Sequence, residues 1–225
     1  MNPYVLHGFN PSPYSVKMRA ILRYRRIPFV WDGIGNPRDI AVAANLPPVI
    51  PILRFPDGRL MNDSTPLAYA LEREHPGERS IVPDDPVHAY LSDLLEDFGD
   101  EWVTKMMFHY RWYYAADRVC AQAWIITSRN PVMADAERCA AMQAFNDRLV
   151  GRMALVGCTE QNRPVIEESH RFVLDTLDRP YAQAPFRYQG KCHDALRKKL
   201  AALPADVRRR LAPVLEEAGC LPYLV

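Results

Sequence analysis

The chain has 225 residues, enough for one large or two ordinary domains, and its composition of 48% hydrophobic and 24% charged residues is that of a folded globular protein. Its formal net charge of +1 gives no overall electrostatic reason to expect a nucleic-acid partner. The N-terminus lacks a signal-peptide pattern, and no apolar run reaches about eighteen residues. We therefore expect no membrane segment and a cytoplasmic location.

Cysteine and histidine spacing argues against a metal or disulfide framework. The five cysteines are scattered, odd in number and never spaced as C-x-x-C. The six histidines show neither H-E-x-x-H nor H-x-x-x-H spacing. We expect buried or incidental thiols and no metal site.

The first motif is a hydroxyl at the point where a strand gives way to a helix. Residues 4–7 form a short apolar run typical of a strand. Ser12 follows where a helix needs an N-cap, and Pro13 stands where the first helical N–H has no intrahelical partner. The apolar stripe of that helix comprises Tyr14, Met18, Ile21 and Leu22, whereas Lys17 falls off it.

Two interpretations of Ser12 stay open at this point. Serine followed by proline begins many helices that bind nothing, so Ser12 is a good cap in any case. The free N–H groups and the dipole of a helix N-terminus also stabilise anions, including a thiolate to which a serine hydroxyl donates a hydrogen bond.

The next sixty residues predict more strands and helices. Residues 27–31 are β-branched and aromatic and indicate a second strand, parallel to the first through the intervening helix. A short helix is expected between residues 36 and 46. The pair Asp57-Gly58 lies between two apolar runs and predicts a hairpin. Pro51 is tolerated at the start of the first hairpin strand, and a cis bond before it would turn the backbone of Ile50 outward.

A dense set of capping residues follows the hairpin at residues 62–66 and begins a helix that runs to about residue 75. The order is therefore strand, helix, strand, short helix, two hairpin strands and helix. This is a βαβ unit followed by a ββα unit.

These residues resemble the glutathione S-transferase superfamily, whose N-terminal domain is a thioredoxin-like fold of this order. Three motifs carry the resemblance: residues 12–19 (SPYSVKMR), residues 49–53 (VIPIL) and residues 62–65 (NDST). It implies that Ser12 donates to the glutathione thiolate and that Ile50, next to Pro51, pairs with the cysteinyl backbone. Asp63 and Ser64 would then bind the γ-glutamyl amine and carboxylate.

Two departures from the family pattern stand out. Relatives often carry a cation just before the cis-proline loop, for the glycine carboxylate of glutathione, whereas Pro47-Pro48-Val49 supplies no charge here. Ser15 stands where a resolving cysteine would be needed, so dithiol chemistry is not available from this motif.

The predicted architecture is an α/β thioredoxin-like domain over residues 1–78, a linker at 79–86 and an all-α domain over 87–225. Residues 87–130 predict two long helices, and further helices are expected at about 133–153, 159–177, 192–202 and 207–219. The Ser/Thr-x-x-Asp capping box common in related helical domains is absent between residues 177 and 225. The helical domain is therefore divergent or shortened.

Aromatic residues gather in the middle of the first helical stretch. One interpretation is a core and a dimer interface; the other is that some of the rings line a pocket for a second substrate. The resemblance implies such a pocket between the domains, and the candidates are Tyr14, Phe98, Trp102 and Phe108. The acidic residues 96–101 and the basic residues 197–199 and 208–210 are interpreted as solvated helix faces.

The leading hypothesis is a glutathione-dependent enzyme in which glutathione is a co-substrate, and its thiolate, stabilised by Ser12, attacks a small electrophile. The alternative is a non-catalytic glutathione-transferase-like protein that binds a ligand or another protein. The resemblance also implies a homodimer. Nucleic-acid binding ranks last.

Overall fold

The computed structural model describes residues 2–77, 79–178 and 200–217. The chain divides into two compact units, each made of two segments. The first unit joins Met1–Ile81 to Phe108–Val156, and the second joins Val82–Met107 to Gly157–Val225. The domain boundaries at residues 78 and 87 remain predictions.

A four-stranded sheet forms the centre of the N-terminal domain. Its strands are β1 (Tyr4–His7), β2 (Phe29–Asp32), β3 (Ile52–Arg54) and β4 (Leu60–Asn62), in the order β2-β1-β3-β4. β1 pairs with β2 in parallel, whereas the β1–β3 and β3–β4 pairs are antiparallel. The expected βαβ and ββα units are confirmed, and the domain is thioredoxin-like.

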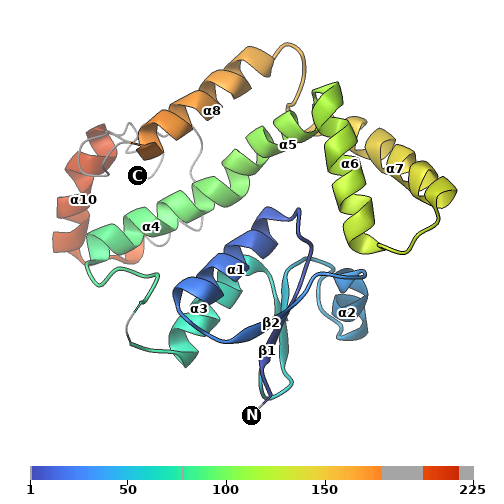
Figure 1. The fold of residues 1–225 in the computed structure, drawn as a ribbon. Coiled ribbons are helices and arrows are strands. Elements are labelled where there is room, and N and C mark those ends of the chain that lie inside the picture. The colour runs from blue at the N-terminus through green and yellow to red at the C-terminus, as the bar shows by residue number, and fades with distance from the viewer. Residues whose placement is uncertain (1, 78, 179–199, 218–225) are drawn as a thin grey trace. The chain divides into compact units, whose positions relative to one another are not determined.

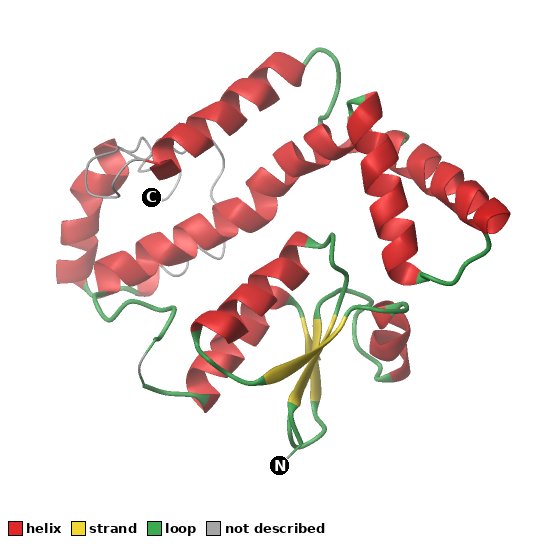
Figure 2. Cartoon of the chain, viewed as in Figure 1, coloured by secondary structure: helices red, strands yellow, loops and turns green. Residues whose placement is uncertain are grey.

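Three helices complete this domain: α1 (Pro13–Tyr24), α2 (Pro37–Ala43) and α3 (Ser64–Glu74). α1 and α3 lie on one face of the sheet and α2 lies on the other (Figures 1 and 2). The core between the sheet and the helices α1 and α3 is built of side chains that are fully buried, among them Leu6, Met18, Leu22, Leu53, Leu67 and Leu71. Burial of these apolar side chains fixes the ends of the strands and helices that carry the polar motifs.

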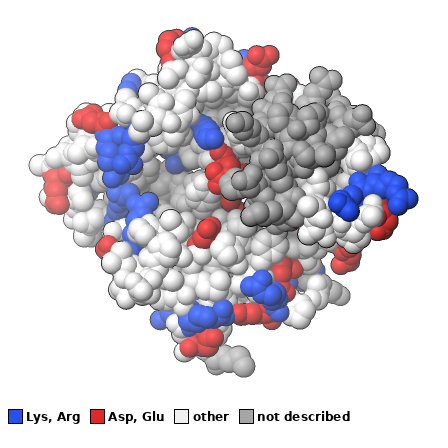
Figure 3. All heavy atoms as spheres, turned by 180° about the vertical axis from the view of Figure 1, so that it is seen from behind, with Lys and Arg blue, Asp and Glu red and all other residues white. Residues whose placement is uncertain are grey.

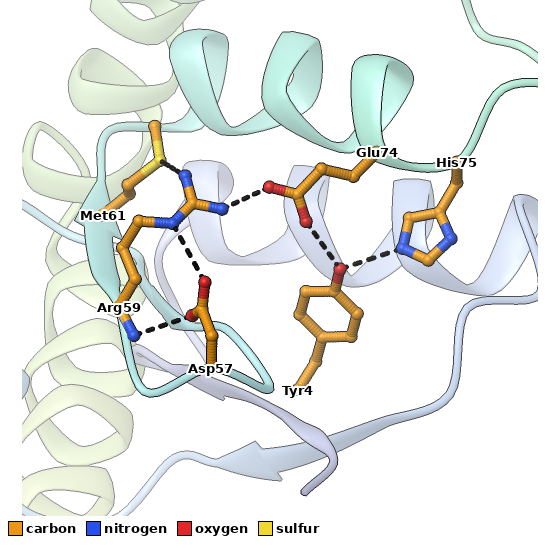
Figure 4. Close-up of polar contacts among 6 residues, drawn as sticks. All are labelled: Tyr4, Asp57, Arg59, Met61, Glu74 and His75. Carbon is orange, nitrogen blue, oxygen red and sulfur yellow. Dashed lines mark hydrogen bonds and ion pairs between the residues drawn. The ribbon is translucent and has the colours of Figure 1, made fainter. Parts of the chain in front are cut away.

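A hydrogen-bond network closes the sheet at the edge where β1 begins (Figure 4). The hydroxyl of Tyr4 donates to Glu74 at 3.0 Å and lies 2.9 Å from Nε2 of His75. Arg59 pairs with Glu74 and stacks its guanidinium 3.9 Å from the ring centre of Phe55. The network therefore joins β1, the hairpin and the end of α3.

Tyr4→Phe is expected to lower the free energy of unfolding by about 1 kcal/mol at neutral pH, because it removes a hydrogen bond to a carboxylate. Burial and the Glu74 carboxylate raise the pKa of Tyr4 from 10.0 to about 12. The neutral phenol is thus favoured in the folded state, so its contribution is complete below pH 10.0 and is lost as the pH rises to about 12.

Urea unfolding of both proteins across that pH range checks this. Tyr24→Phe, which alters a side chain that is 49% exposed, is the control. A difference between wild type and Tyr4→Phe that does not shrink at high pH would contradict the expectation.

Beyond residue 81 every described element is helical. The helices are α4 (Pro86–Phe98), α5 (Thr104–Trp112), α6 (Ala115–Arg129), α7 (Asp135–Val150), α8 (Arg163–Asp178) and α10 (Ala205–Glu217). A π-helical turn, Gly99–Val103, joins α4 to α5, and a 3-10 turn, Met153–Val156, follows α7. The expected helical character is confirmed, with ends shifted by a few residues.

Within the second unit, α4 and α10 share an apolar cluster that includes Tyr90, Leu94 and Leu211. Asp85 caps α4 by accepting from the N–H of His88 and also pairs with Arg210 of α10 at 2.7 Å. Arg210 thus has a structural partner, and residues 208–210 are exposed as expected. Most of the helix expected at 192–202, its basic residues 197–199 and most of the stretch searched for the capping box lie outside the described residues.

Candidate functional site

The strand register brings the three sequence motifs to one edge of the sheet. His7, the last residue of β1, pairs with Ile52, the first residue of β3, which also pairs with Asn62, the last residue of β4. The loop to Ser12, the Ile50-Pro51 bond and the start of α3 each adjoin one of these paired residues. The sheet therefore gathers segments that are far apart in the sequence, from Ser12 to Ser64.

Ser12 caps α1 as the sequence predicts. Its side-chain oxygen accepts a hydrogen bond from the N–H of Ser15 at 3.3 Å, and Pro13 is the first helical residue. That bond uses a lone pair, so the hydroxyl proton is still available to a ligand. The first turn of α1 holds no acidic side chain that would compete for the positive helix end.

Buried contacts hold the loop that leads to Ser12. Ser15 is fully buried, and its hydroxyl accepts from the N–H of Phe9 at 3.2 Å. A Cβ added to Gly8 would come within 2.4 Å of the Ser15 oxygen, so only glycine permits this close approach. Ser15 is thus a structural residue that fixes the loop between β1 and α1.

The Ile50-Pro51 bond is cis. The loop before it is held by two side chains from elsewhere: Asn62 donates to the carbonyl oxygens of Pro47 and Val49, at 2.5 and 3.3 Å, and Arg38 donates to that of Pro48 at 3.1 Å. Sequence reasoning missed both residues. Arg38 places a positive charge beside this loop, whose residues Pro47-Pro48-Val49 carry none.

Asp63 and Ser64 lie at the N-terminus of α3. The N–H of Asp63 donates to the carbonyl of Pro51 at 3.2 Å, which joins this motif to the cis-proline loop. Asp63 is exposed and has a positive φ of 74°, a conformation that costs free energy for residues other than glycine and is common at ligand sites. The Asp63 carboxylate makes no capping hydrogen bond to α3. The next residue, Ser64, is buried.

Lys17 is the residue that sequence reasoning left out. From the second turn of α1 its amino group donates to the hydroxyls of Ser64, at 3.2 Å, and Thr65, at 3.4 Å. A cation is unfavourable at the positive end of α3, where the first turn holds no acidic residue. An anion bound there would pair with both the lysine and the helix end. The only sign of this role in the sequence is that Lys17 falls off the apolar stripe of α1.

The four residues predicted for a second-substrate pocket are divided between the two compact units. Tyr14 is half-buried in α1, and the Phe108 ring lies 6.3 Å from that of Trp112. Phe98 and Trp102 belong to the other unit and pack against its α4–α10 cluster. The pocket remains a prediction.

Two further searches cover only the part of the chain that the structure describes. There, no helix is both long and apolar enough to cross a bilayer. In the same residues, no group of three or more His, Cys, Asp or Glu side chains is placed to hold a metal ion. The described cysteines are unpaired, and burial raises the pKa of the Cys158 thiol.

Comparison with known proteins finds a family whose N-terminal domain matches the segment that carries all three motifs. Residues 6–79 match the family model described as "Glutathione S-transferase, N-terminal domain". Residues 6–79 therefore form a domain of the glutathione S-transferase N-terminal type. A rice protein (Oryza sativa subsp. japonica) named a "probable glutathione S-transferase" is 27% identical over 107 residues. That match spans 44% of this chain and 44% of the rice protein.

Solved structures similar to the chain include glutaredoxin 2 from Salmonella typhimurium in complex with glutathione, at 13% identity and a TM-score of 0.44, with all of both chains covered. A glutathione S-transferase from Methylobacillus flagellatus, solved with glutathione bound, is 20% identical with a TM-score of 0.39. The similarity covers 67% of this chain and 68% of that one.

Proposed function

We propose that this protein binds glutathione along the sheet edge described above and uses its thiolate to attack a small electrophile. The observation that carries the proposal is Lys17, whose cation stands against the positive N-terminus of α3, on the same sheet edge as Ser12. Two positive centres on one edge suit a ligand with a carboxylate at one end and a thiolate farther along.

The γ-glutamyl end would bind at α3. Its carboxylate would pair with Lys17 and accept from the Ser64 hydroxyl, and its amine would pair with the exposed carboxylate of Asp63. The cysteinyl backbone would then pair with Ile50, neither of whose backbone groups makes a hydrogen bond among the described residues.

The glycine end would continue along the loop before Pro51. Arg38, which donates to the Pro48 carbonyl, would supply the cation for the glycine carboxylate. Arg38 would thus replace the cation that Pro47-Pro48-Val49 does not supply.

The chemistry assigned to Ser12 is stabilisation of a thiolate. An unperturbed cysteine thiol has a pKa of about 8.5, so most of it is protonated at neutral pH. The Ser12 O–H and the N-terminus of α1 would stabilise the ionised form, and the thiol proton would pass to solvent. The sulfur would then form a bond to the electrophilic carbon as the leaving group departs with its bonding pair.

Calorimetric titration with glutathione tests this. Binding in the micromolar to millimolar range, followed by conjugation of a small electrophile, is the expected result. The absence of heat at high glutathione concentration would favour the alternative of a non-catalytic binding protein. The cytoplasmic location and homodimer remain part of the proposal, and sedimentation at two protein concentrations tests the dimer.

A further inference from the structure

Three helices of the first compact unit each contribute one arginine whose charge bears on Arg129 or is Arg129 itself: Arg38 of α2, Arg129 at the end of α6 and Arg148 near the end of α7. The guanidinium carbons of Arg129 and Arg148 lie 4.8 and 4.9 Å from the ring centre of Phe145. Figure 3 shows Lys and Arg side chains gathered on the side that carries these three helices.

No carboxylate pairs with these three arginines among the described residues. The Nε atom of Arg129 is buried and has no hydrogen-bond partner there. The pKa of Arg129 is lowered, first by burial and then by repulsion from Arg38 and Arg148. Arg129 is therefore close enough to the other two cations to be repelled by them, and a bound anion would relieve that repulsion.

Helix ends explain part of this arrangement. Arg129 and Arg148 are in the last turns of their helices, where a cation is favourable. A solvent-facing arginine would serve equally well there, yet Arg129 is half-buried between the rings of Phe9 and Phe145. Arg38 lies in the first turn of α2, where a cation is unfavourable.

Arg129 adjoins the loop that presents Ser12. The guanidinium of Arg129 lies 5.2 Å from the ring centre of Phe9, whose carbonyl accepts from the N–H of Ser12 at 3.1 Å. In the proposed binding mode the glycine carboxylate pairs with Arg38. A single carboxylate at that place leaves Arg129 and Arg148 without an anion.

We propose that Arg129 and Arg148 bind an acidic group, a carboxylate or sulfonate, on the electrophile that the thiolate attacks. The inference rests on the proposed function for the identity of this occupant. The planar fork of a guanidinium matches such a group with two parallel hydrogen bonds, and stacking on Phe145 holds both forks in place. The enzyme thereby prefers acidic electrophiles over neutral ones.

The first experiment measures anion binding without glutathione. Sulfate is expected to raise the thermal midpoint of the wild type above that in chloride at equal ionic strength, and Arg129→Gln is expected to abolish the difference. Arg118→Gln, at the other end of α6, is the matched control and should respond as the wild type does. Equal sulfate responses in wild type and Arg129→Gln would overturn the site.

The second experiment compares two chloronitrobenzenes that differ only in one carboxylate. The preference for the acidic compound in kcat/KM is expected to fall about tenfold in Arg129→Gln and by less in Arg129→Lys, which keeps the charge but loses the fork. An unchanged preference would refute the assignment.

The third experiment separates the electrophile from the glycine carboxylate. Glutathione and its glycine ethyl ester are titrated into both proteins, and Arg129→Gln is expected to weaken neither. Selective weakening of glutathione would show that the arginines serve its glycine carboxylate and would contradict the proposal. Sulfate stabilisation without any turnover would refute the enzymatic function and the electrophile as occupant, while the anion site would stand.

Discussion

Ser12→Ala is expected to lower kcat/KM for conjugation between about tenfold and a hundredfold at neutral pH, the scale of losing one hydrogen bond to a charged group. Without the hydroxyl, the pKa of bound glutathione moves up toward that of a free thiol. The loss should therefore shrink as the pH rises, because the thiolate then forms without help. The pH dependence of kcat/KM and the thiolate absorbance of the bound ligand measure both effects.

The same substitution removes a helix cap and costs about 1 kcal/mol of stability, so the two roles must be separated. Ser12→Asp does this because aspartate caps a helix as well as serine does, yet its carboxylate donates no hydrogen bond and repels a thiolate. It should keep the stability of the wild type and lose more activity than Ser12→Ala. Ser12→Thr should retain activity. If Ser12 only caps α1, Ser12→Ala will lower stability and leave the pH profile unchanged.

Local signals predicted most of the N-terminal fold. Ser12 and Pro13 mark the start of α1 because capping depends on residues within one turn. Asp57-Gly58 predicts the hairpin because its turn needs a positive φ, and Gly58 has a φ of 90°. The resemblance added the grouping of Pro51, Asp63 and Ser64, which no local pattern supplies.

Contacts between distant residues could not be predicted in this way. Lys17 meets Ser64 across 47 positions, and its role follows only once α1 and α3 share a face of the sheet. The contact of Arg129 with Phe9 spans 120 positions. A lysine off an apolar stripe or an arginine at a helix end is ordinary in sequence, so only the fold distinguishes these residues.

Lys17→Met is expected to weaken glutathione binding by about tenfold to a hundredfold, because a hydrogen bond to a charged group contributes about 1.5–3 kcal/mol. The free protein should lose little stability. Lys17→Met removes the hydrogen bonds to Ser64 and Thr65, but it also relieves the repulsion between the lysine and the positive end of α3. Calorimetric titration and urea unfolding of the ligand-free protein measure the two quantities.

Two controls tie this effect to the γ-glutamyl carboxylate. Arg23→Met removes an exposed charge from the last turn of the same helix and should bind glutathione as the wild type does. A glutathione analogue whose γ-glutamyl carboxylate is an amide should bind the wild type more weakly than glutathione, and Lys17→Met should bind both alike. If Lys17→Met weakens both ligands equally relative to the wild type, the lysine does not contact that carboxylate, and its place at the end of α3 needs another explanation. Because stability and affinity are expected to respond independently, a merely structural lysine would be recognised by a loss of stability without the loss of selectivity.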